Sequence, residues 1–268
     1  MSVPGLTPTP CVLPQRLAAP ERSADTCALI VAGGVGERFG DACGKQYVEL
    51  CGLPIVCWSL IAFDRAPSVA QIVLVVAEGR LQDVRSEVLP RVSLDAPVVL
   101  ARGGATRQDS VSAGLAAMDE TLALVAVHDA ARPLIETPAI ETCVARLRAD
   151  EGLDGAICAA RSTDTLKLVE GETVVATPDR SFYWAAQTPQ AFRTRTLKAA
   201  HRAARFDDYR GTDDASLVER RGGRIACVET STTNLKVTHP NDFLIAQAFM
   251  EARLMSEGCG ISPMEGGL

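Results

Sequence analysis

Short runs of apolar residues alternate with helix-like segments from residue 27 onward. The runs are continuous stretches of Val, Ile, Leu and Ala, which are typical of strands covered on both faces. We predict such strands at residues 28–31, 72–76, 98–100, 124–127, 155–159 and 224–228. We predict helices at residues 54–64, 81–89, 108–118 and 138–148, the last with Thr137 as its N-cap and Pro138 at its first position. This alternation favours an α/β fold with a doubly wound, mainly parallel, Rossmann-like sheet.

One segment interrupts the alternation of strands and helices. Residues 164–177 consist of two β-rich stretches on either side of Glu170-Gly171. This pattern predicts a β-hairpin, inserted where a helix is expected. An arm of this kind, at about residues 161–182, would project from the sheet and would have to bury its apolar side. We therefore expect the arm to form the contact of a homodimer.

The length of the chain, 268 residues, is enough for one substantial core. We predict a single domain at residues 26–256. Residues 1–25 contain five prolines and no helical or strand period, which indicates a disordered extension, and residues 257–268 are expected to form a flexible tail. The sequence contains neither the apolar region of a secretory signal nor a run of about 18 apolar residues that could span a membrane.

Charge and cysteine usage narrow the class of protein further. The net charge is −6 and aromatic residues make up 4% of the chain, whereas nucleic-acid binders usually carry a basic stripe with aromatic side chains. We therefore expect neither a nucleic acid nor a membrane as partner.

The nine cysteines are odd in number and form no Cys-x-x-Cys pair, and Cys57, Cys143, Cys158 and Cys227 lie in apolar stretches. Reduced thiols in a cytoplasmic protein are the interpretation that fits this pattern.

A glycine-rich loop follows the first predicted strand, with the sequence AGGVGERFG at residues 32–40. Closely spaced glycines let backbone N–H groups approach a polyphosphate. Phe39 stands where a dinucleotide-binding loop needs Gly or Ala, and the Gly-Lys-Ser/Thr ending of a Walker A loop is absent. The loop carries Arg38 and is followed by Lys45 instead. Two cations beside a glycine cradle suit a reaction in which negative charge builds up on a phosphate.

Further motifs follow this loop in a fixed order. They are GGATRQDSV at 103–111, VHDAARP at 127–133, DTLK at 164–167, DR at 179–180, QTPQ at 187–190, TDDA at 212–215 and NLKVT at 234–238. Together with the glycine loop, they resemble the sugar-phosphate nucleotidyltransferases, and within these the 2-C-methyl-D-erythritol 4-phosphate cytidylyltransferases of the non-mevalonate isoprenoid pathway. The resemblance extends over about residues 28–250. The chain departs from it at Gly33, at Gly44 where relatives have Pro, and at residues 181–184.

The resemblance implies that a phosphate oxygen of methylerythritol phosphate attacks the α-phosphorus of CTP and that pyrophosphate leaves, with Mg²⁺ as cofactor. The catalytic residues that it implies are Arg38, Lys45, Arg180 and Lys236. The residues implied to bind CTP are Ala32, Gly33, Gly34, Gly36, Gly103, Gly104, Ser110 and Asp129, and Asp129 is also the candidate metal ligand. The residues implied to bind the second substrate are Arg132, Thr165 and Thr188.

The histidines and the rival functions complete the expectations. His128 follows an apolar strand and is expected to be a structural hydrogen-bonding partner, while His201 and His239 indicate no role. A cytidylyltransferase for another polyol phosphate, such as ribitol 5-phosphate, would share the fold and both loop cations. An NAD-dependent dehydrogenase and a nucleotide-sensing module are alternatives from other classes, and Phe39 disfavours the first.

Overall fold

A seven-stranded sheet forms the centre of the protein, whose computed structural model describes residues 24–34 and 44–257, apart from the side chain of Lys45. The strand order is β11-β7-β10-β6-β1-β4-β5. All neighbouring pairs are parallel except the two that β10 makes with β6 and β7. The strands are β1 (Thr26–Ala32), β4 (Val69–Val76), β5 (Val98–Arg102), β6 (Leu124–Asp129), β7 (Gly155–Arg161), β10 (Trp184–Arg193) and β11 (Ile225–Glu229). The predicted α/β fold with a mainly parallel sheet is confirmed.

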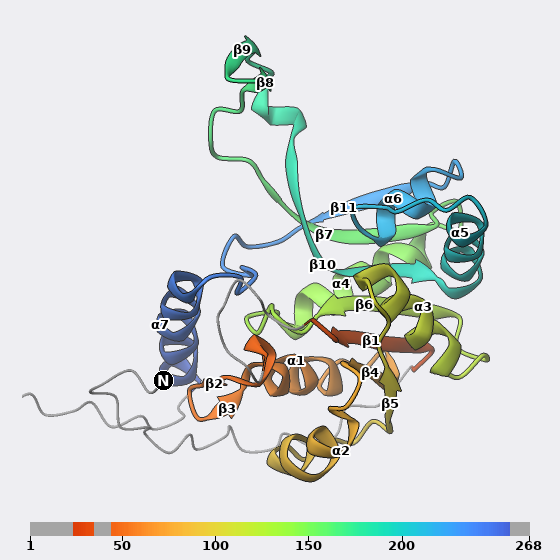
Figure 1. Ribbon diagram of the computed structural model, residues 1–268, viewed down its shortest axis with the longest axis vertical. Coiled ribbons are helices and arrows are strands. Elements are labelled where there is room, and N and C mark those ends of the chain that lie inside the picture. Colours follow the sequence, from red (N-terminus) through yellow and green to blue (C-terminus); the bar gives the residue numbers. More distant parts are fainter. Residues whose placement is uncertain (1–23, 35–43, 258–268) are drawn as a thin grey trace, which may run out of the picture.

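Helices cover both faces of this sheet (Figure 1). The first face is covered by α1 (Ile55–Asp64) and α4 (Thr137–Ala149), and α7 (Pro240–Ser256) stands to the side and adds Ala246, Met250 and Leu254 to the same core. The second face is covered by α3 (Arg107–Ala117), α5 (Thr194–Phe206) and α6 (Asp214–Glu219). Because successive side chains of a strand point to opposite faces, Ala28 and Ile30 of β1 belong to the first core, while Cys27 and Leu29 belong to the second. The continuous apolar runs therefore reflect burial on both faces.

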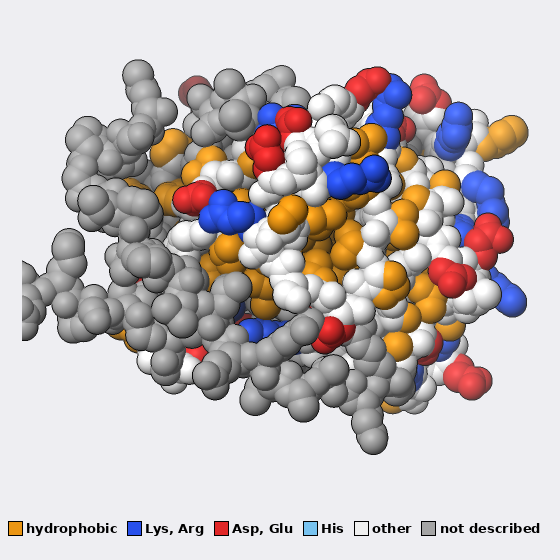
Figure 2. All heavy atoms as spheres, turned by 90° about the horizontal axis from the view of Figure 1, so that it is seen from below, with side chains coloured by type: hydrophobic (Ala, Val, Ile, Leu, Met, Phe, Trp, Pro, Cys, Tyr) orange, Lys and Arg blue, Asp and Glu red, His pale blue; other side chains and the backbone are white. Residues whose placement is uncertain are grey.

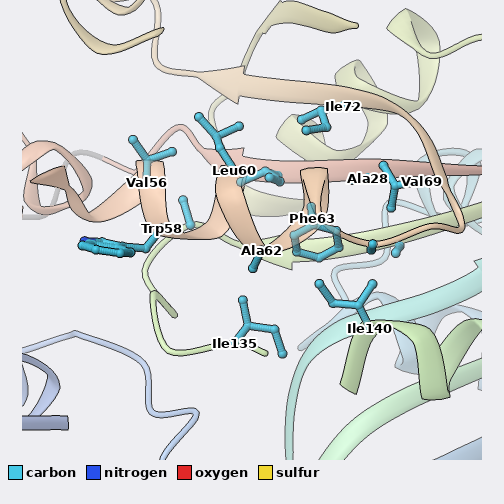
Figure 3. Packing of buried hydrophobic residues seen from close by; sticks show 14 of the residues in the cluster. Ala28, Val56, Trp58, Leu60, Ala62, Phe63, Val69, Ile72, Ile135 and Ile140 are labelled. Carbon is cyan, nitrogen blue, oxygen red and sulfur yellow. The ribbon is translucent and has the colours of Figure 1, made fainter. Parts of the chain in front are cut away.

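The first core is built around the side chains of α1. Figure 3 shows Phe63 of this helix between Ile72 of β4 and Ile140 of α4, while Leu60 points to the same side as Ile72. All four side chains are fully buried. Burying one such side chain stabilises the fold by about 1.5–3 kcal/mol relative to leaving it exposed, so this packing fixes α1 and α4 against the sheet.

The strand β10 is the element that the sequence patterns failed to predict. It contains Pro189, and a proline argues against a central strand because it cannot donate a ladder hydrogen bond. The pairing of β10 with β7 is interrupted between Ala186 and Gln190, which places Pro189 inside this irregularity. The proline is therefore accommodated without loss of a ladder hydrogen bond, and β10 joins β6 to β7.

The predicted hairpin is present as β8 (Leu168–Glu170) and β9 (Thr173–Ala176), which pair antiparallel. Gly171 has a φ of +59°, a left-handed conformation that favours glycine in the turn. Figure 1 shows the hairpin at the tip of an arm that projects far from the sheet. Its apolar side chains are exposed, including Leu168 at 60% and Val174 at 54%.

The remaining elements are short. They are the 3₁₀ turn η1 (Lys45–Tyr47), the pair β2 (Glu49–Leu50) and β3 (Leu53–Pro54), the helical segment α2 (Leu81–Asp83), η2 (Val84–Val88) and η3 (Leu89–Arg91), and the 3₁₀ turn η4 (Arg180–Phe182). The helix predicted at 81–89 is thus a chain of three helical turns with a π turn in its middle. The N-cap predicted at Thr137 is wrong by one residue. Glu136 occupies the N-cap position, and the Thr137 hydroxyl donates to the carbonyl of Ala62 instead.

The four cysteines of the apolar stretches are all free thiols, as predicted, and three of them are buried. Cys57, Cys143 and Cys158 are buried thiols, and the sulfurs of the last two lie 3.5 Å apart. Burial raises the pKa of Cys57 to about 12, which makes its thiol inert. Cys227 is a free thiol as well, but it is exposed on the edge strand β11.

The surface carries charges of both signs. On the face that Figure 2 shows, apolar side chains gather in the middle of the view, and basic and acidic side chains are interspersed around them. Within the described ranges, no helix has the length and the apolar character needed to cross a membrane.

Candidate active site

The carboxyl ends of β1, β4, β5 and β6 surround an open cavity of about 610 Å³. From β1 the chain builds β4 and β5 on one side, and β6 lies on the other side of β1. Ligands of open α/β sheets bind at such a switch point, outside the carboxyl ends of the strands. Eight predicted residues line this cavity, namely Ala32, Gly33, Gly34, Gly103, Gly104, Ser110, Asp129 and Lys236. They are far apart in sequence, so the fold alone brings them together.

The glycine loop leaves β1 on one side of the cavity, and a buried glutamine holds its first residues. The Gln46 side chain donates to the carbonyls of Ala32 and Gly34, at 2.8 and 2.9 Å. The site prediction missed Gln46, although it directly follows Lys45, which the resemblance implies to be catalytic. Gly36 and Arg38 lie outside the described residues, and the side chain of Lys45 is not described.

The opposite side of the cavity is formed by the loop between β5 and α3. A Cβ atom added to Gly104 would lie 2.3 Å from Cβ of Asp109, so only glycine fits there. The Ser110 hydroxyl donates to the carbonyl of Thr106 at 2.9 Å and accepts from the N–H of Gly104 at 3.2 Å. Thr106 is the N-cap of α3, so Ser110 does not serve as the cap. Ser110 shapes the loop from within the cavity lining, and its contact with cytosine stays a prediction.

Asp129 ends β6 and is held between two cations. Its Oδ1 accepts from Nε of Arg107 at 2.8 Å, and its Oδ2 accepts from Nζ of Lys236 at 2.7 Å. Burial by itself would raise the pKa of Asp129, but the charges of Arg107 and Lys236 outweigh it and hold the pKa below its ordinary value. The carboxylate is therefore ionised, and it aims both cations at the cavity. Arg107 was missed by the site prediction, although it stands at the start of the helix that follows the glycine pair.

The position of Lys236 is set by the segment after β11. The N–H of Val237 donates to the carbonyl of Ala131 at 2.8 Å, and the Arg132 guanidinium donates to the carbonyl of Asn234 at 2.7 Å. The Asn234 amide in turn donates to the carbonyl of Thr188 at 3.0 Å. These contacts place Lys236 at the cavity from a segment more than a hundred residues away from Asp129. The structure uses Arg132 to hold this segment, and its contact with a substrate stays a prediction.

His128 and Thr188 lie directly behind Asp129. The Thr188 hydroxyl accepts from the N–H of Asp129 at 3.1 Å and lies 3.1 Å from Nδ1 of His128, to which it donates. Nε2 of His128 then donates to the carbonyl of Arg132 at 3.3 Å. Burial lowers the pKa of His128 to about 3, so the ring is neutral. The predicted structural role of His128 is confirmed, whereas substrate binding by Thr188 stays a prediction.

The structure does not bring Thr165 and Arg180 to the cavity. Both residues are exposed on the arm, where Arg180 donates to the carbonyl of Thr163. The arm leads away from the carboxyl ends of the strands in Figure 1. Their contact with the second substrate therefore stays a prediction.

Asp129 is the carboxylate at the cavity that could bind a metal ion. Among the described residues, no cluster of three or more His, Cys, Asp or Glu could hold a metal. Mg²⁺ is usually held by one or two carboxylates together with substrate phosphates. The ionised Asp129 fits that role, because each of its oxygens has a second lone pair beyond the one that its cation uses.

A doubly wound sheet with glycine-rich loops and paired cations at its switch point is typical of a nucleotide-binding protein of the Rossmann-like class. A sequence model of the 2-C-methyl-D-erythritol 4-phosphate cytidylyltransferases matches residues 26–252. The chain belongs to this family. This assignment excludes the dehydrogenase alternative.

Individual relatives agree with the family assignment. The 2-C-methyl-D-erythritol 4-phosphate cytidylyltransferase of Syntrophotalea carbinolica is 41% identical over 83% of this chain and 95% of its own length. The enzyme of the same name from Geobacter metallireducens is 39% identical over 85% of this chain and 98% of its own length. The crystal structure of 4-diphosphocytidyl-2C-methyl-D-erythritol synthase from Anaerococcus prevotii has a TM-score of 0.74 at 27% identity, and covers 84% of this chain and 98% of that one.

Proposed function

We propose that this enzyme transfers a cytidylyl group from CTP to 2-C-methyl-D-erythritol 4-phosphate, which yields 4-diphosphocytidyl-2-C-methyl-D-erythritol and pyrophosphate. The observation that carries the proposal is the cavity between the two glycine loops, with Asp129 holding Lys236 and Arg107 at its edge. A polyanion fits such a lining of main-chain amides and cations. The names of the relatives supply the nucleotide and the polyol phosphate.

Catalysis in this proposal depends on positioning and charge. A phosphate oxygen of the polyol attacks the α-phosphorus of CTP, and the bond from that phosphorus to the pyrophosphate oxygen breaks. Arg38 and Lys45 stabilise the negative charge on the α-phosphate and on the leaving pyrophosphate, while Lys236 holds the attacking phosphate in line. Because both reactants are anions, the cations also offset their mutual repulsion.

Asp129 is the residue that would hold Mg²⁺ together with the phosphates of CTP. The metal would neutralise phosphate charge and fix the geometry of the triphosphate. Asp129 therefore has two tasks in this proposal, since it also orients Lys236 and Arg107.

The active form is proposed to be a homodimer joined through the arm. Leu168, Val174 and Phe182 of the arm are exposed by 60%, 54% and 82%. Apolar side chains gathered on a projecting hairpin favour a protein partner, and a second copy is the simplest one. In that dimer Thr165 and Arg180 would meet the polyol phosphate in the partner's cavity.

The direct test is incubation with CTP, Mg²⁺ and methylerythritol phosphate, followed by mass detection of the cytidine diphospho product. Ribitol 5-phosphate serves as the matched second substrate. Faster turnover with ribitol 5-phosphate, or no product with either polyol phosphate, would contradict the proposal.

The two loop cations are tested by substitution. Arg38→Ala and Lys45→Ala are each expected to lower kcat by about 10²–10³ while CTP binding changes little.

A further inference from the structure

A chain of charged side chains runs from the cavity into the interior of the protein. Beyond Asp129, the Arg107 guanidinium also donates through Nη1 to Oδ2 of Asp214 at 2.7 Å. The other oxygen of Asp214, Oδ1, lies 3.0 Å from Nε2 of His201. The chain therefore continues from Lys236 through Asp129 and Arg107 to Asp214 and His201.

The inner end of this chain cannot touch a bound nucleotide. The side chains of Asp214 and His201 are exposed by 1% and 4%, and neither residue lines the cavity. Asp214 is the first residue of α6, and His201 lies on α5, whereas Arg107 begins α3. The charges of Lys236 and Arg107 balance those of Asp129 and Asp214. The buried carboxylate of Asp214 therefore needs no further counter-ion.

Asp214 decides how Arg107 meets Asp129. A guanidinium can bind one carboxylate through two parallel N–H donors. Here Asp214 binds Nη1, whose N–H groups do not run parallel to that of Nε, and so anchors the guanidinium with Nε at Oδ1 of Asp129, which leaves Oδ2 to Lys236. Without the charge of Asp214, the guanidinium loses this anchor and can turn two parallel donors to both oxygens of Asp129, where it competes with Lys236 for the carboxylate.

We propose that Asp214 and His201 are positioning residues that act through Arg107 and Asp129 on Lys236, and so set the affinity for the polyol phosphate. His201 donates to Asp214 and fixes the orientation of its carboxylate. The inference rests on the proposed function, because it takes Lys236 to be the residue that holds the second substrate.

The test compares steady-state kinetics of the full chain and of Asp214→Asn, with pyrophosphate release as the assay. Asp214→Asn is expected to raise the KM for methylerythritol phosphate about 10- to 100-fold, with the KM for CTP changed much less, because displaced supporting groups commonly cost that much. In a Lys236→Ala background, the same substitution is expected to cause no further rise. A structural defect would instead add to the effect of Lys236→Ala and would affect both substrates.

Gln108→Ala is the matched control. The Gln108 side chain donates to the carbonyl of Tyr209 at 3.1 Å and accepts from the N–H of Gly211 at 3.1 Å, so it also ties the start of α3 to the segment before α6. It takes no part in the charged chain. Its removal is expected to leave the KM for the polyol phosphate close to that of the wild type.

His201 supplies a second, milder variant if Asp214→Asn does not fold. His201→Leu removes the donor to Asp214 and is expected to raise the KM for the polyol phosphate, while His201→Gln keeps a donor and is expected to restore it. An unchanged KM in His201→Leu, or additive effects of Asp214→Asn and Lys236→Ala, would overturn the inference. Failure of the wild type to convert methylerythritol phosphate would refute the proposed function instead, so the two failures are distinguishable.

Discussion

Gly104 provides a sharp test of the cavity wall next to α3. In Gly104→Ala the new Cβ atom would lie 2.3 Å from Cβ of Asp109 and 3.2 Å from the backbone carbon of the same residue. These atoms belong to the first turn of a helix, so no flexible side chain can move aside. Either the loop or the helix start has to shift, and the shift disturbs the capping box that Thr106 and Asp109 form.

The magnitude follows from two contributions. Overpacking of this kind costs about 1–3 kcal/mol, and the loss of a capping interaction costs about 1 kcal/mol. The total of about 2–4 kcal/mol corresponds to a Tm lower by about 4–16 °C for a domain of this size. The hydrogen bond from the N–H of Gly104 to Ser110 is expected to break as well, which should weaken CTP binding.

Thermal unfolding followed by circular dichroism, together with CTP titration by calorimetry, measures both effects. Gly34→Ala is the matched control, because no atom of the described residues lies within 4 Å of a Cβ atom at Gly34. Its Tm is expected to equal or slightly exceed that of the wild type, since alanine restricts the unfolded chain. A Tm of Gly104→Ala within about 1 °C of the wild type would refute the close approach of the loop to α3.

Four further predictions follow from the site and the arm. Lys236→Ala should raise the KM for the polyol phosphate, and an unchanged KM would remove Lys236 from the site. Gln46→Ala should raise the KM for CTP in the pyrophosphate-release assay, because two carbonyls of the glycine loop lose their hydrogen-bond donor. Val174→Asp should yield monomers in light scattering, since it places a charge on the apolar arm. Burial lowers the pKa of His128 from 6.5 to about 3, so the neutral ring contributes stability above pH 6.5. As the pH falls from 6.5 towards 3, this contribution to the free energy of unfolding is lost by about 1.4 kcal/mol per pH unit. Urea unfolding of His128→Gln should therefore show a flatter dependence of stability on pH.

Much of the fold followed from local patterns. The runs at 28–31, 72–76 and 124–127 became β1, β4 and β6, because strands buried on both faces need continuous apolar residues. The β-rich stretches about Gly171 became the hairpin, since turn residues act over a few positions only. The strand β10 was not predicted, since a proline such as Pro189 is acceptable in it only because its pairing with β7 is irregular at that point.

The sequence by itself determined the layered sheet, the hairpin, the two glycine loops and the carboxylate that ends β6. Each depends on residue types at close spacing, and period and turn chemistry act over such distances. Only the tertiary structure decided that Arg107, Asp129, Asp214 and Lys236 form one chain of charges. Their partners lie up to 107 positions apart, and which charges meet depends on how α3 and α6 pack against the sheet. For the same reason His201 indicated no role in the sequence, yet its ring lies buried against Asp214.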